Sequence, residues 1–146
     1  MTGSNYNSSL TTKEIAQRVR EYVKKNFPGY KFSVRSSHNS IDVEMKSAPV
    51  KVYKTTDEMT TAEVLDAAEN AYRCSAWSLD NYTVAEARAE LEKLYNGHWI
   101  RRVMNDEVAA TVAAVDKYVN SYVRDDSDPW ADYFDVNFYY SRCAIA

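Results

Sequence analysis

The residue types that usually carry chemistry are few and scattered in this chain of 146 residues. The two histidines, His38 and His98, and the two cysteines, Cys74 and Cys143, show none of the HxxxH, HExxH or CxxC spacings of metal sites. The three glycines fit neither GxGxxG nor GxxxxGK, which excludes the known phosphate-binding loops. We therefore predict no metal and no cofactor, and we expect both cysteines to be reduced thiols.

Two groups of residues resemble catalytic sites only superficially. The stretch Ser36–His38 and Asp42 supply the residue types of a nucleophilic triad, but neighbours in one turn generally cannot converge as nucleophile and base. Asp42 and Glu44 lie on one face of an expected strand, opposite Lys31 and Arg35, where ion pairs between strands are favoured over an acid–base dyad. No catalytic residue is predicted, and we do not expect an enzyme.

Charge is distributed unevenly along the chain. Residues 1–60 carry ten Lys and Arg against six Asp and Glu, a net charge of +4, whereas residues 61–146 carry eight against fifteen, a net charge of −7. The two halves together give the overall charge of −3. One interpretation is that the two halves present solvated faces that attract each other.

A sharper interpretation concerns the segment from Asp125 to Asp135, where five aspartates surround three large aromatic rings. Carboxylates repel phosphate but suit a basic protein surface, to which aromatic rings add contact energy. The predicted partner-binding residues are Asp125, Asp126, Asp128, Trp130, Asp132, Tyr133 and Asp135. In the alternative, the rings of Trp130, Tyr133 and Phe134 pack in the core while the aspartates stay in solvent.

A competing hypothesis assigns nucleic-acid binding to the basic first half of the chain. Its candidate residues are Arg18, Lys24, Lys25, Lys31 and Arg35. The isoelectric point near 5.4 weighs against this hypothesis, because a dedicated nucleic-acid binder usually has an excess of basic residues.

The elements that must position these residues follow from capping and periodicity. Thr11 and Glu14 form a capping box that starts a helix, and Phe27-Pro28-Gly29 ends it. Alternation over residues 30–46 then predicts a β-hairpin, with Val34 and Ile41 facing the core.

The second part of the chain has mainly helical periodicity. Thr60 or Thr61 caps one predicted helix, and Thr83 with Glu86 starts another. A long helix over residues 108–122 carries a stripe of valines and Tyr122 that is either core or the seam of a homodimer. Alternation within residues 132–146 predicts a last strand that returns to the hairpin.

These elements predict an α+β fold. We expect an antiparallel sheet of three to four strands, formed by the N-terminal hairpin and the C-terminal strand, with about four helices packed on one face. Residues 1–9 are expected to be a flexible tail and residues 10–146 a single domain. The first residues lack a secretory signal, and no apolar run is long enough to span a membrane, so a cytoplasmic location in the host cell is predicted.

One family resemblance rests on three short stretches. Lys13-Glu14-Ile15-Ala16, the run from Phe27 to Ser36, and Ser40-Ile41-Asp42-Val43 resemble the large polyvalent protein-associated domain family 29, most clearly over residues 10–46. This resemblance implies an origin on a phage or conjugative element and a role in conflict with the host, and it supplies no catalytic residue.

We therefore expect a small mobile-element protein that binds and inhibits a host defence protein by steric occlusion. The expected target is a nucleic-acid-handling effector with a basic surface, for example a CRISPR effector. The alternative is a nucleic-acid-associated accessory module of a mobile element that acts through its basic first half.

Overall fold

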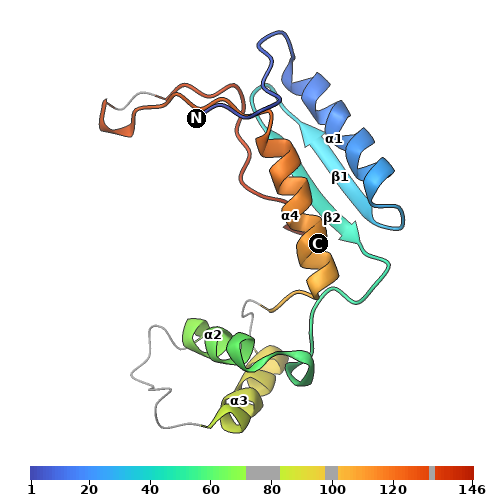
Figure 1. Cartoon of the computed structure of the whole chain (residues 1–146), viewed down its shortest axis with the longest axis vertical. Helices are drawn as coiled ribbons and strands as arrows, with labels where there is room; N and C mark the ends of the chain where they lie inside the picture. Colours follow the sequence, from blue (N-terminus) through green and yellow to red (C-terminus); the bar gives the residue numbers. More distant parts are fainter. Residues whose placement is uncertain (72–82, 98–101, 132–133) are drawn as a thin grey trace. The chain divides into compact units, whose positions relative to one another are not determined.

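The computed structural model describes residues 1–71, 83–97, 102–131 and 134–146 and divides into two compact units (Figure 1). Unit 1 comprises Met1–Val50 and Glu107–Ala146, and unit 2 comprises Lys51–Asp106. A single domain over residues 10–146 stays a prediction, which the number of calorimetric unfolding transitions tests.

Unit 1 begins with helix α1 (Thr12–Asn26), whose ends lie where the sequence predicts them. The Thr11 hydroxyl accepts a hydrogen bond from the backbone N–H of Glu14 at 3.2 Å, so the first turn is capped. At the other end Gly29 has a φ of 91°, a left-handed conformation that favours glycine and reverses the chain into the first strand.

Strands β1 (Lys31–Ser36) and β2 (Ile41–Ser47) form the predicted antiparallel hairpin. Val34 pairs with Val43 and Arg35 pairs with Asp42. Val34 and Ile41 are buried whereas Arg35 and Asp42 are exposed, which confirms the predicted faces of the two strands.

The C-terminal strand differs from the prediction in direction and length. Strand β3 (Ala144–Ile145) returns to the hairpin as expected, but it has two residues and runs parallel to β2, so the sheet is mixed in the order β1-β2-β3. A tight turn would force antiparallel pairing, whereas the chain between β2 and β3 contains several helices and leaves the direction open. Of the alternating residues before β3, Tyr139 forms an isolated bridge with Ser40, and Val136 forms another with Asp125.

Helix α4 (Asp106–Asn120) completes the core of unit 1. Its stripe is buried together with the apolar face of α1 and the inner face of the sheet. The rings of Tyr22 on α1 and Tyr118 on α4 stack with their centroids 3.9 Å apart, so the two helices lie side by side on the same sheet face (Figure 1). The buried stripe residues are Val108, Val112, Val115, Val119 and Tyr122. The stripe is therefore core and not the seam of a homodimer.

Unit 2 contains a short 3-10 helix, η1 (Thr56–Glu58), and the two predicted helices α2 (Thr61–Ala71) and α3 (Val84–Gly97). Thr60 caps α2 and Thr83 caps α3 through hydrogen bonds to the backbone N–H three residues on, both at 3.2 Å. The two helices share a separate core, made of Met59, Val64, Ala68, Ala87 and Leu91. In the described part of the chain, no helix has the length and apolarity that a membrane span requires.

Candidate functional site

Residues 123–131 and 134–137 form an arm that projects from unit 1 (Figure 1). Its two sides pair through the backbone: the N–H of Asp126 donates to the carbonyl of Asp135 at 2.9 Å, and the N–H of Asn137 donates to the carbonyl of Arg124 at 3.2 Å. The 3-10 helix η3 (Pro129–Ala131) lies between these two sides. The predicted partner-binding segment is thus a structured arm.

The N-terminus forms a third side of the arm. The terminal amino group donates to the carbonyl of Asp125 at 2.7 Å, and the N–H of Gly3 donates to the carbonyl of Val123 at 2.7 Å. A Cβ atom on Gly3 would lie 2.3 Å from the carbonyl oxygen of Ser121, so only glycine fits there. The polar composition of residues 1–9 did not predict these hydrogen bonds.

Arg124 holds the two sides of the arm together. Its guanidinium forms a bidentate pair with Asp135, at 2.7 and 3.1 Å, and contacts Asp126 at 2.5 Å. These two carboxylates raise the pKa of Arg124 above its already high ordinary value, Asp135 contributing more. Two of the predicted partner-binding carboxylates therefore already have an internal partner.

The other described carboxylates shape the turn of the arm. Asp125 accepts a hydrogen bond from the backbone N–H of Ser127 at 3.0 Å, which lowers the pKa of Asp125 and keeps it ionised at neutral pH. Asp128 accepts from the backbone N–H of Trp130 at 3.1 Å. Asp132 and Tyr133, also predicted to bind the partner, lie outside the described residues.

The two described large aromatic rings of the arm face solvent. Trp130 is 98% exposed and Phe134 is 65% exposed. The alternative in which these rings pack in the core while the aspartates remain free is therefore wrong for both rings. The arm can instead present a large apolar ring on a backbone that hydrogen bonds and ion pairs hold in place, which suits recognition.

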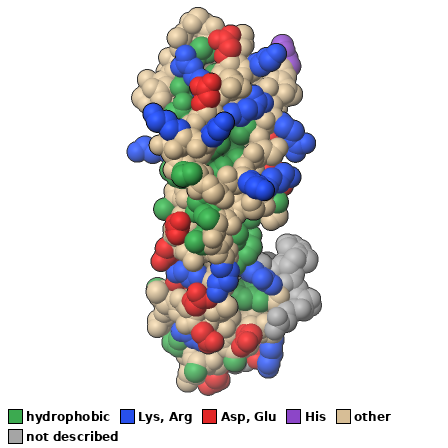
Figure 2. Space-filling view, turned by 90° about the vertical axis from the view of Figure 1, so that its right-hand side faces the viewer, with side chains coloured by type: hydrophobic (Ala, Val, Ile, Leu, Met, Phe, Trp, Pro, Cys, Tyr) green, Lys and Arg blue, Asp and Glu red, His purple; other side chains and the backbone are tan. Residues whose placement is uncertain are grey.

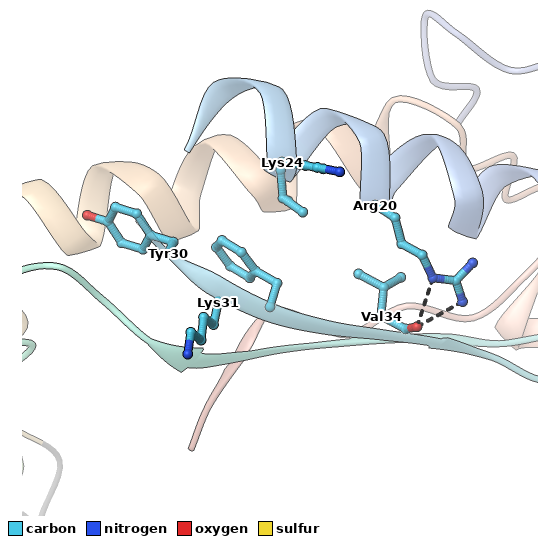
Figure 3. Close-up of a pocket in the computed structure, with 7 residues that line it drawn as sticks. Arg20, Lys24, Tyr30, Lys31 and Val34 are labelled. Atoms are coloured by element: carbon cyan, nitrogen blue, oxygen red, sulfur yellow. Dashed lines mark hydrogen bonds between the residues drawn. The ribbon is translucent and has the colours of Figure 1, made fainter. Parts of the chain in front are cut away.

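In contrast to the acidic arm, a groove lined by basic residues lies between α1 and the edge strand β1. It has a volume of about 400 Å³ and is lined by Arg20, Val23, Lys24, Tyr30, Lys31, Phe32 and Val34. The guanidinium of Arg20 reaches down from α1 and donates to the carbonyl of Val34 through Nε and Nη2, at 3.3 and 2.9 Å (Figure 3). Lys24 lies one turn further along α1, and Lys31 extends from β1 on the side away from the helix.

The five predicted nucleic-acid-binding residues do not form one site. Lys24 and Lys31 line the groove, whereas Arg18 lies over the ring of Tyr122, 5.8 Å from its centroid. Arg35 lies on the outer face of the sheet, 3.9 Å from a carboxylate oxygen of Glu44. Lys25 is exposed in the last turn of α1 and is not among the groove residues. Lys and Arg side chains are nevertheless numerous on the side of unit 1 that faces the viewer in Figure 2.

Sequence reasoning missed two residues that organise these surfaces, Arg20 and Arg124. Arg124 precedes Asp126 by two residues, a spacing that in paired extended backbone places both side chains on one face. Arg20 is one of five cations on α1 and carries no local signal, because its contact with Val34 depends on how the helix packs on the strand. Among the described residues, no three His, Cys, Asp or Glu side chains are placed to hold a metal ion.

Comparison with known proteins identifies a family. The family model of large polyvalent protein associated domain 29 matches residues 10–87, more than half of the chain. The chain belongs to this family. Membership in large polyvalent protein associated domain 29 makes it a phage- or mobile-element-associated protein. The matched residues include α1, β1, β2 and the basic groove, whereas the arm lies outside them. Neither the curated proteins nor the solved structures gave a significant match.

Proposed function

We propose that this protein binds a host defence protein through its arm and inhibits it by steric occlusion. The target class is a nucleic-acid-handling effector with a basic surface, such as a CRISPR effector. The proposal places the protein in the host cytoplasm, without a membrane role, and assigns it no catalytic chemistry.

The observation that carries the proposal is the exposure of Trp130 on a braced arm. Folding removes almost none of the apolar surface of Trp130 from water, because the side chain is 98% exposed. This surface therefore remains available for contact with a partner. Tryptophan is among the residues that most often dominate binding energy when a partner buries them. Because Arg124 and the backbone hydrogen bonds hold the arm in place, little conformational entropy is lost when it docks.

The charge of the arm indicates the kind of partner surface. Residues 123–137 contain five aspartates and one arginine, a net charge of −4. An acidic arm is attracted to a basic surface, which effectors that hold nucleic acid must have. Occupying such a surface blocks access by nucleic acid, so inhibition requires no reaction.

The test measures binding kinetics to purified, guide-loaded CRISPR effectors by surface plasmon resonance. Trp130→Ala should raise the dissociation rate by about 30-fold or more, the value of ~2 kcal/mol expected for an anchor residue. Replacing Asp125 and Asp128 with Asn should mainly lower the association rate and flatten its dependence on salt. In cells that carry the effector, wild-type protein should restore plaque formation by a targeted phage, and Trp130→Ala should not.

Two controls distinguish a loss of contacts made by the arm from a general loss of folded structure. Leu65→Ala removes a partly exposed apolar side chain from α2 in unit 2 and should leave binding unchanged. Circular dichroism melting should show that Trp130→Ala folds as the wild type does, since an exposed ring contributes little to stability. If Trp130→Ala binds an effector with wild-type kinetics, the arm is not the interface.

A further inference from the structure

Unit 1 carries two surfaces that complement each other in chemistry. Residues 12–47 contain eight Lys and Arg against four Asp and Glu, a net charge of +4, and the arm has a net charge of −4. The groove offers Arg20 and Lys24 of α1 beside the rings of Tyr30 and Phe32, with Lys31 at its rim. The arm offers the exposed ring of Trp130 next to Asp128.

The two surfaces cannot meet within one molecule. Figure 1 shows the arm projecting from one side of unit 1, while α1 and the edge strand β1, which form the groove, lie on the other side. We propose that the arm of one molecule docks into the basic groove of a second copy of this chain. The stripe on α4, the other surface considered for self-association, is buried and cannot serve.

The groove supplies what the arm requires. Its volume of about 400 Å³ lies in the range of cavities that accept a small ligand, and Tyr30 and Phe32 offer apolar contacts to an indole ring. Lys24 can pair with a carboxylate of the arm inside the groove, and Lys31, at the rim, adds positive charge to this side of unit 1. Arg20 is held by the Val34 carbonyl at the open edge of the sheet. A backbone N–H of the incoming arm can donate to the Val34 carbonyl in place of Arg20, and the Arg20 guanidinium can then pair with a carboxylate of the arm.

The arrangement also fixes the form of the assembly. Because each molecule has one arm and one groove on opposite sides, the contact is head to tail and does not close on itself at two copies. Docking covers Trp130, so self-association and binding of a host protein through the arm exclude each other. The inference needs no host protein, and its test is therefore independent of the proposed function.

Sedimentation analysis of the full chain provides the test, from about 1 to 500 µM at low and high salt. We expect the average mass of the wild type to rise with concentration, with a dissociation constant of roughly 10–100 µM, and to fall when salt screens the charges. A groove variant (Arg20→Gln, Lys24→Gln, Lys31→Gln) and an arm variant (Asp128→Asn, Trp130→Ala) should each remain monomeric. Mixed in equal amounts, the two variants retain one intact arm and one intact groove and should form a complex of two chains that grows no further.

A matched control changes three cations of unit 1 that do not line the groove, Lys13→Gln, Lys25→Gln and Arg35→Gln, and should associate as the wild type does. If loss of the Arg20 contact unfolds the groove variant, the double variant Lys24→Gln, Lys31→Gln carries the same test. A wild type that stays monomeric at low salt overturns the proposal. So does a mixture of arm and groove variants that fails to associate, or a control variant that loses association equally.

Discussion

Replacing Val43 with aspartate tests the register of the hairpin and the position of the core. Val43 lies on the central strand β2, is 2% exposed and pairs with Val34 under the two helices. The substitution removes the burial of a valine side chain, worth ~2 kcal/mol. It also introduces a carboxylate into an apolar site, which costs several kcal/mol more. The total, about 5 kcal/mol or more, approaches the whole stability of a typical domain, so Val43→Asp should unfold unit 1 at neutral pH.

The matched control is Ser33→Asp, which introduces the same side chain on the neighbouring strand but on the opposite, solvent-facing side of the sheet. Ser33 pairs with Glu44, so the cost is the repulsion of two like charges across the strands, up to about 1 kcal/mol. Urea unfolding followed by far-UV circular dichroism compares the two variants with the wild type, and hydrogen exchange of the hairpin amides reports on unit 1 alone.

The pH dependence adds a second check on the same variant. Burial raises the pKa of the introduced carboxyl above its unfolded value, so its neutral form is favoured in the folded state. The difference in free energy of unfolding between the wild type and Val43→Asp should therefore shrink as the pH falls from 7 towards 4. The strand faces would be assigned the wrong way round if the free energy of unfolding of Val43→Asp lay within about 1 kcal/mol of the wild-type value at pH 7. The same conclusion would follow if Ser33→Asp lowered the free energy of unfolding as much as Val43→Asp does.

Three further predictions concern other parts of the molecule. Burial, and then the nearby charge of Asp116, raise the pKa of Cys143 to about 11, and burial followed by a hydrogen bond to Asp116 raises the pKa of Tyr140. Both groups favour their neutral forms in the folded state, so the free energy of unfolding should fall as the pH rises above the ordinary pKa of each group, 9.0 for Cys143 and 10.0 for Tyr140. Urea unfolding at increasing pH should show the decline, and Tyr140→Phe should reduce the part of it above pH 10. Gly3→Ala should detach the N-terminus from the arm, because its Cβ would lie 2.3 Å from a backbone oxygen, and faster exchange of the Asp125 amide, which donates to the carbonyl of Met1, would report this. Short duplex DNA should bind no tighter than ~10⁻⁴ M at physiological salt, measured by fluorescence anisotropy, whereas tight binding that salt abolishes would favour the nucleic-acid alternative.

Local signals predicted the helices and the hairpin well. Thr11, Thr60 and Thr83 all cap helices in the structure, because a capping hydroxyl acts on a backbone N–H only three residues away. Alternation gave the correct face for Val34 and Ile41, since successive side chains of a strand always point to opposite sides. In each case the residues that give the signal lie within a few positions of the structure that they determine.

Long-range features could not be predicted in this way. The parallel direction of β3 depends on how about a hundred intervening residues return to the sheet, and no local pattern records that path. The pairing of Gly3 with Val123 likewise joins segments that are remote in the sequence. For Trp130, sequence reasoning left core and surface open, because an apolar ring normally favours burial, whereas this one lies in an arm formed by pairing between segments that are separate in the sequence.

The internal pairing of the arm changes which of its residues can contribute to binding. In the sequence the five aspartates form one acidic cluster, but Arg124 neutralises part of that charge, and Asp125 and Asp128 accept hydrogen bonds that shape the turn. A carboxylate that already holds the arm together cannot also leave it to satisfy a partner without loosening the arm. The acidic charge therefore orients and accelerates an encounter, while the lifetime of any complex, with a host protein or with a second copy, depends on where the ring of Trp130 is buried.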